Sequence, residues 1–135
     1  MATQKKLWKE EGNKWFIRNE SNGNDSFFNL DKETINLIQK YDLNNNKILE
    51  IGCSNGSRLH YLNQEFKASE FYGIDPSDKA IADGKQKYPK LNLAIGTADQ
   101  LDFKNESFDI VIFGFCLMVV DLNDLFKIVY EADRV

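Results

Sequence analysis

The feature that most constrains the fold is the stretch KILEIGCSNGSRL, which runs from Lys47 to Leu59. A short apolar run ends at Gly52, small and polar residues follow, and a helical pattern begins after Gly56. Because glycine lacks a Cβ atom, the chain can bend sharply at such a break and approach a ligand closely. The amides at the start of the following helix would face that ligand. The stretch therefore predicts a strand, a ligand-binding turn and a helix.

The same alternation continues to the end of the sequence. Apolar runs predict strands over 47–51, 70–74, 91–95 and 108–113. Helical patterns predict helices over 56–65, 77–87 and 121–134, the last with Asp121 as its N-cap. Strands joined by helices through short connections form right-handed crossovers, so the predicted fold class is α/β, a doubly wound parallel sheet. We expect residues 31–135 to form this domain, with Asp31 capping its first helix, and residues 1–30 to form an N-terminal helical segment.

Composition argues against several classes of function. The chain has 135 residues, enough for one domain with a buried core, and its net charge of −4 argues against a nucleic-acid partner. No apolar run is long enough for a membrane span, and the N-terminus lacks the apolar segment of a signal peptide. The two cysteines, Cys53 and Cys116, lack metal-ligand spacing. We therefore expect reduced thiols, a cytoplasmic protein and no metal site.

The turn after Gly52 by itself leaves four possibilities open: a nicotinamide dinucleotide, a nucleotide phosphate, S-adenosylmethionine or no ligand. A phosphate-binding P-loop requires a lysine followed by serine or threonine, whereas Ser57 and Arg58 follow Gly56 here. The dinucleotide fingerprint of three glycines retains only its first, Gly52.

Acidic residues follow the next two predicted strands. Asp75 ends the second strand, where a carboxylate can accept hydrogen bonds from both hydroxyls of a ribose. Asp99 follows the third strand and could accept from an adenine amino group. Each residue alone is also compatible with a helix cap or a surface turn. The glycine turn, Asp75 and Asp99 follow three successive strands, and together they favour a ligand site over a generic turn.

Taken together, these segments resemble the class I S-adenosylmethionine-dependent methyltransferases, which have a Rossmann-like fold. The family's first motif is an acidic residue two positions before a glycine-rich turn. LEIGCSNG supplies Glu50, Gly52 and Gly56, with Ser54 where the family often has a glycine. Glu50 also separates the chain from nicotinamide enzymes, whose corresponding residue is usually apolar. FDIVIFGFCLMVVD is similar to the family's fourth-strand motif, and the likeness covers about residues 31–135.

The resemblance implies an S-adenosyl-L-methionine cofactor and a set of residues that bind it. Asp75 would hold the ribose, Pro76 would lie beside the adenine, and Asp99 would take the adenine amino group. The implied cofactor-binding residues are Glu50, Gly52, Cys53, Ser54, Gly56, Asp75, Pro76, Asp99, Gln100, Phe113 and Phe115. The predicted function is methyl transfer to an unidentified acceptor, with a small molecule favoured. The alternatives are a non-catalytic cofactor-binding or scaffolding domain and, less favoured, a nicotinamide-dependent oxidoreductase.

Two departures from the family pattern bear on catalysis. The pattern continues into a fifth strand, whereas this sequence stops at Val135, so we expect a truncated sheet of about four strands. An exposed apolar edge of this kind predicts self-association. The family's histidine after the fourth strand is absent, and His60 lies in a predicted helix away from the strand ends, so no catalytic base is predicted. Two interpretations of the N-terminal segment stay open: a lid over the cofactor formed by Trp15, Phe16, Arg18 and Asn19, or simple docking of the first helix by Trp15 and Phe16.

Overall fold

Four parallel strands form the core of the molecule, in the order β3-β2-β1-β4. The computed structural model describes residues 4–21, 32–33 and 35–135. The strands are β1 (Lys47–Ile51), β2 (Glu70–Asp75), β3 (Asn92–Ile95) and β4 (Ile110–Phe113). The second strand along the chain pairs on one side of β1 and the fourth on the other, which places the topological switch point beside β1. The predicted α/β fold class is confirmed.

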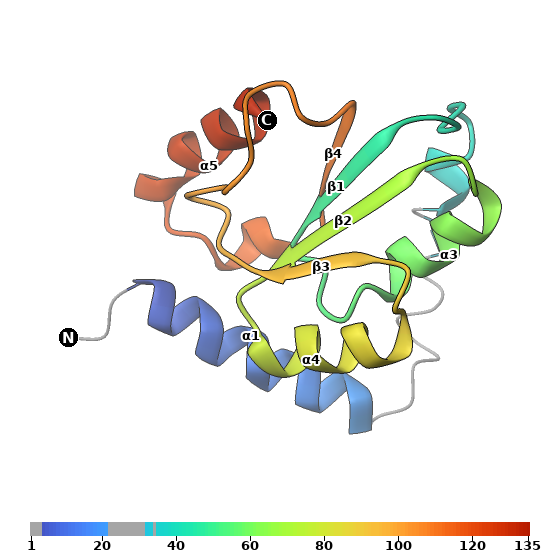
Figure 1. Cartoon of the computed structure of the whole chain (residues 1–135). Helices are drawn as coiled ribbons and strands as arrows, with labels where there is room; N and C mark the ends of the chain where they lie inside the picture. The colour runs from blue at the N-terminus through green and yellow to red at the C-terminus, as the bar shows by residue number, and fades with distance from the viewer. Residues whose placement is uncertain (1–3, 22–31, 34) are drawn as a thin grey trace.

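Helices cover both faces of the sheet (Figure 1). α3 (Ser57–Glu65) and α4 (Asp78–Lys87) lie on one face, and α5 (Leu122–Arg134) lies on the other. α1 (Gln4–Ser21) runs alongside α4, and a 3-10 helix, η1 (Cys116–Val119), follows β4. Asp121 caps α5 as expected, since its carboxylate accepts from the Asn123 amide at 3.0 Å. The predicted cap Asp31 lies outside the described residues.

The core consists of two apolar clusters, one on each face of the sheet. Ile48 of β1 belongs to the cluster under α3 and α4, together with Leu59 and Ile81. Leu49 and Ile51 point to the opposite face, where they pack with Val135 at the end of α5. Because β1 is central and covered on both faces, it is a nearly continuous apolar run rather than an alternating one.

The predicted strand over 108–113 is two residues shorter in the structure. The amide of Phe108 donates to the Val135 carbonyl (2.8 Å), and the amide of Asp109 donates to the Lys47 carbonyl (2.9 Å). β4 therefore begins at Ile110, because the amide of Phe108 bonds to the end of α5 instead of to β1.

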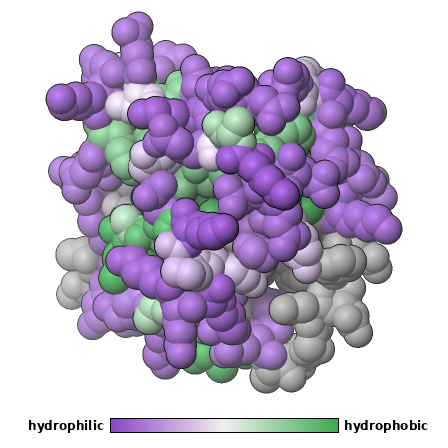
Figure 2. All heavy atoms as spheres, turned by 45° about the vertical axis from the view of Figure 1, so that its right-hand side comes forward, coloured by the Kyte–Doolittle hydropathy of each residue, from purple (hydrophilic) through white to green (hydrophobic). Residues whose placement is uncertain are grey.

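The outer surface differs from one part of the molecule to another. The face drawn in Figure 2 is largely hydrophilic, with hydrophobic atoms visible only between hydrophilic side chains. In contrast, α5 exposes a stripe of large apolar side chains: Leu122, Phe126, Val129 and Tyr130. None of the helices among the described residues is long and apolar enough to cross a membrane.

Candidate functional site

The turn after β1 lies at the switch point and is tightly wound. Gly52, Ser54 and Gly56 have positive φ angles of 80°, 51° and 83°. The Gly52 amide donates to the Ile74 carbonyl of β2 (2.8 Å), which fastens the turn to the neighbouring strand. A Cβ atom on Gly52 would lie 2.7 Å from the Cβ of Cys116, so a larger residue does not fit here. The turn is therefore pressed against the segment that follows β4.

Asp75, at the end of β2, is buried next to this turn. Its Oδ2 accepts from the Ser54 amide (2.9 Å) and its Oδ1 accepts from the Ser77 amide (2.8 Å). Burial raises the pKa of Asp75, and these two amides oppose that rise by stabilising the ionised form. The two hydrogen bonds hold the carboxylate in one orientation, while each oxygen can still accept another hydrogen bond.

Helix α1 docks beside Asp75 through polar contacts. The hydroxyl of Ser77, the N-cap of α4, donates to Asn13 Oδ1 at 2.6 Å. Lys9 forms an ion pair of 2.7 Å with Asp78 in the first turn of α4. The start of α4 therefore donates to the carboxylate on one side and contacts α1 on the other.

Aromatic residues of α1 extend this contact into an enclosed space. Trp8 and Phe16 are buried, and both line the cavity that Asp75 faces, as does Trp15. A Cβ atom on Gly12, between them on the helix, would lie 3.5 Å from the Oδ1 atom of Asp75. The helix therefore docks on the domain with side chains that also line the cavity, and its opening as a lid stays a prediction.

A buried ion pair lies on another wall of the cavity. The Oε1 atom of Glu50 is 2.5 Å from the Nη1 atom of Arg58, and both side chains are less than a tenth exposed. The Arg58 guanidinium also lies 5.2 Å from the centre of the Phe115 ring. Sequence reasoning identified Glu50 and Phe115 but missed Arg58. A cation in the first turn of a helix opposes the helix dipole, and this signal could have indicated a buried acidic partner.

These groups surround a cavity of about 440 Å³ at the carboxyl ends of the strands. Seven of the predicted residues line it: Glu50, Gly52, Cys53, Ser54, Asp75, Pro76 and Phe115. Gly56 does not, since a Cβ atom there would meet Leu91 and Leu93 in the core. Phe113 packs in the apolar cluster under α5 instead. Asp99 and Gln100 also lie outside the lining.

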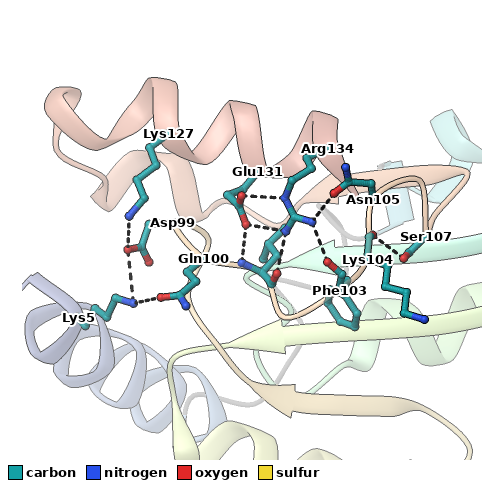
Figure 3. Close-up of polar contacts among 11 residues, drawn as sticks. Lys5, Asp99, Gln100, Phe103, Lys104, Asn105, Ser107, Lys127, Glu131 and Arg134 are labelled. Atoms are coloured by element: carbon teal, nitrogen blue, oxygen red, sulfur yellow. Dashed lines mark hydrogen bonds and ion pairs between the residues drawn. The ribbon is translucent and has the colours of Figure 1, made fainter.

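The side chain of Asp99 is held between the two ends of the chain (Figure 3). Its Oδ2 atom lies 3.5 Å from the Lys5 ammonium of α1 and 3.3 Å from that of Lys127 on α5. Lys5 also donates to Gln100 Oε1 (3.2 Å). Burial raises the pKa of Asp99, but hydrogen bonds from Thr97 and Lys127 and the nearby lysine charges outweigh it and leave the pKa below its usual value. Neighbouring residues of the same loop, including Thr97, line the cavity.

Both cysteines are free thiols that line the cavity. Burial is the main cause of their raised pKa values, which for Cys116 reaches about 11. Both thiols therefore stay protonated at neutral pH and are poor nucleophiles. His60 stacks on Tyr88, with ring centres 4.5 Å apart, and is not among the lining residues. In the described part of the chain, no group of three His, Cys, Asp or Glu side chains is placed to hold a metal ion.

The family is established by comparison with known proteins. The family profile described as a methyltransferase domain matches residues 48–135, and the chain belongs to this family. It is 33% identical over 73 residues to the phthiotriol/phenolphthiotriol dimycocerosates methyltransferase of Mycobacterium leprae. The aligned region covers 53% of this chain and 27% of that protein. It is 30% identical over 87 residues to putative methyltransferase 235L of invertebrate iridescent virus 6. That aligned region covers 61% of this chain and 31% of the viral protein.

Solved structures show the same fold. The PH0226 protein of Pyrococcus horikoshii matches with a TM-score of 0.72 and 22% identity, over 81% of this chain and 52% of that one. A TehB-like SAM-dependent methyltransferase of Corynebacterium glutamicum matches with a TM-score of 0.64 and 21% identity, over 73% and 53%. The matched region is thus about half the length of these structures and less than a third of the two curated relatives.

Proposed function

We propose that this chain binds S-adenosyl-L-methionine in the cavity and serves the transfer of its methyl group to a small-molecule acceptor. The observation that carries the proposal is the buried carboxylate of Asp75, which is oriented by the Ser54 and Ser77 amides and faces the cavity. A carboxylate fixed at the end of the second strand suits the paired hydroxyls of a ribose. Membership of the methyltransferase domain family supports this reading.

The residues around Asp75 fit the remainder of such a cofactor. Gly52 and Ser54 of the tight turn line the cavity at the switch point, so a ligand there can approach their backbone. Pro76 and Thr97 line the side of the cavity next to Asp75, where we place the adenine. Glu50, Cys53 and Phe115 line the part that we assign to the methionine portion.

The chemistry that the cofactor supplies is an activated methyl group on a sulfonium centre. The task of the protein is then to orient the acceptor in line with that group and to exclude water. Phe115, Met118 and Val119 line the cavity and are all substantially exposed, so they suit an acceptor with an apolar part. A general base is required only for a weakly nucleophilic hydroxyl or a protonated amine.

Calorimetric titration tests the proposal directly. We expect S-adenosylmethionine and S-adenosylhomocysteine to bind and NAD not to bind. Because Asp75→Ala removes charge-assisted hydrogen bonds, it should weaken S-adenosylhomocysteine binding about 10- to 100-fold. Asp102→Ala, at an exposed position of the loop after β3, is the matched control and should bind normally. Binding of NAD but of neither sulfur ligand would refute the proposal. Binding without methyl transfer to any acceptor would favour the non-catalytic alternative.

The docked α1 helix supports a second part of the proposal, that it acts as a lid. Trp15 lines the cavity and is only partly buried, whereas Phe16 is buried against the domain. Trp15→Ala should therefore weaken S-adenosylhomocysteine binding while leaving the thermal unfolding midpoint nearly unchanged. A large fall in that midpoint would instead indicate a purely structural contact.

The open edge of the sheet supports self-association. Within the described residues, β4 pairs only with β1, and the neighbouring α5 exposes Leu122, Phe126 and Tyr130. A second copy of the chain would cover this apolar surface. Sedimentation should show dimers of the wild-type chain and monomers of Phe126→Glu. A wild-type chain that stays monomeric would refute this interface.

A further inference from the structure

Arg58 connects two loops that are far apart in the sequence. Its guanidinium forms the buried 2.5 Å ion pair with Glu50, which precedes the turn after β1. The same guanidinium lies over the ring of Phe115, in the segment after β4, at 5.2 Å from the ring centre. All three side chains line the cavity. Arg58 therefore contacts both loops within the wall of the cavity.

The backbones of these loops also meet closely. A Cβ atom on Gly114 would collide with the carbonyl oxygen of Gly52 and lie 2.6 Å from the Oε1 atom of Glu50. Phe115 then adopts a φ of 59°, in the left-handed region that residues with a Cβ rarely occupy. Such a conformation persists only where its surroundings hold it in place. Phe115 as a whole is 43% exposed, so burial alone does not fix its position.

We propose that Arg58 is a positioning residue, which holds Phe115 as a wall of the cofactor cavity and couples that wall to Glu50. The proposal rests on the proposed function for its consequence in cofactor binding. It adds a residue that acts through Phe115 and Glu50.

Arginine has the chemistry for both contacts at once. Its planar guanidinium stays ionised when buried, so it can donate to a carboxylate at its edge while its face covers an aromatic ring. A lysine can keep the charge near Glu50 but has no plane to cover Phe115. Arg58→Lys therefore separates the two contacts: it retains the ion pair and removes the guanidinium from the ring of Phe115.

The experiment combines four variants with two measurements. The variants are Arg58→Lys, Phe115→Leu, their double mutant and Phe115→Tyr. S-adenosylhomocysteine affinity is measured by calorimetry, and the unfolding midpoint of the ligand-free protein by thermal denaturation. We expect each of the first two to weaken binding about five- to tenfold, since the contact is partly desolvated. The double mutant should bind no more weakly than the single mutant with the lower affinity, because the two substitutions remove the same contact. Phe115→Tyr keeps the ring and should therefore lose less affinity than Phe115→Leu.

A third measurement, by NMR, distinguishes failure of this inference from failure of the proposed function. The Nε–H proton of Arg58 should show a ring-current shift in the ligand-free NMR spectrum, retained in Phe115→Tyr and lost in Phe115→Leu. If the wild type bound no S-adenosylhomocysteine but the shift behaved in this way, the coupling would stand and the proposed function would fail. Equal affinity of wild type and Phe115→Leu, or losses that multiply in the double mutant, would overturn the inference. The inference would also be overturned if the variants lost affinity only in proportion to their loss of thermal stability. If Arg58→Lys does not fold, the affinities and ring-current shifts of Phe115→Leu and Phe115→Tyr still test the inference.

Discussion

The substitution Glu131→Gln tests how α5 is fastened to the loop that carries Asp99. Glu131 accepts a hydrogen bond from the Leu101 amide (2.8 Å) and two from Arg134 (2.9 and 2.8 Å), as Figure 3 shows. Arg134 also donates to the carbonyls of Leu101 and Phe103 (2.8 Å each). Hydrogen bonds from Arg134 and Leu101 lower the pKa of Glu131 from its usual 4.5 to about 2. The ionised carboxylate is therefore the centre of this contact.

The size of the effect follows from that pKa. At about 1.4 kcal/mol per pH unit, the fall from 4.5 to about 2 corresponds to about 3 kcal/mol of stability at neutral pH. Glu131 lies near the surface, and screening by solvent reduces the figure to about 1–2 kcal/mol. The pKa in the folded state is below the unfolded value, so the stabilisation is complete above about pH 5. It is lost as the pH falls through 4.5 toward 2.

Urea denaturation at a series of pH values measures this contribution. At pH 7, Glu131→Gln should be less stable than the wild type by about 1–2 kcal/mol. At about pH 3 the difference should fall to less than half, because Glu131 is then protonated in the unfolded chain and must release that proton to fold as a carboxylate. Glu65→Gln, at an exposed carboxylate on α3, is the control and should match the wild type throughout. A difference for Glu131→Gln that does not change with pH would refute the electrostatic explanation.

Substitutions at three further positions test the supports of the site. Ser77→Ala removes the N-cap of α4 and the hydroxyl that contacts Asn13, so calorimetry should show a loss of about 1–2 kcal/mol. Phe16→Ala empties a buried position under α1 and should cost about 3–5 kcal/mol in urea denaturation. Ser54 has a φ of 51°, so Ser54→Val should lower the unfolding free energy by about 1 kcal/mol or more, whereas Ser54→Gly should not lower it. Equal stability of the two Ser54 variants would contradict the assigned backbone strain.

The fold was predictable because each strand and helix carries its own pattern. For the strands and for α3, α4 and α5, predicted and observed ends differ by two residues at most, and the largest difference is at β4. There the amide of Phe108 bonds to the Val135 carbonyl, a contact between segments far apart along the chain. Local apolar patterns cannot show which partner an amide will choose, so such ends are set by tertiary structure.

The lining of the cavity was predictable only where its residues belong to the strand ends or to the turns that follow them. Asp75 and the turn at Gly52 follow directly from the alternation of strands and helices. Phe113 was predicted to approach the cofactor but does not line the cavity. Residues alternate between the faces of a strand, and the side chain of Phe113 points into the core. Arg58 and the lysines around Asp99 act from helices, and a sequence pattern shows only the helix that carries them.

The contribution of α1 to the site explains why its polar contacts and its buried residues have different roles. Lys9 and Asp78 are each more than 40% exposed, and ion pairs of this kind add little stability. They do, however, fix the position of the helix along α4. Most of the free energy of docking therefore comes from Trp8 and Phe16, which are buried and also line the cavity. A ligand that fills the cavity adds contacts to the same two side chains, so ligand binding and helix docking should stabilise each other.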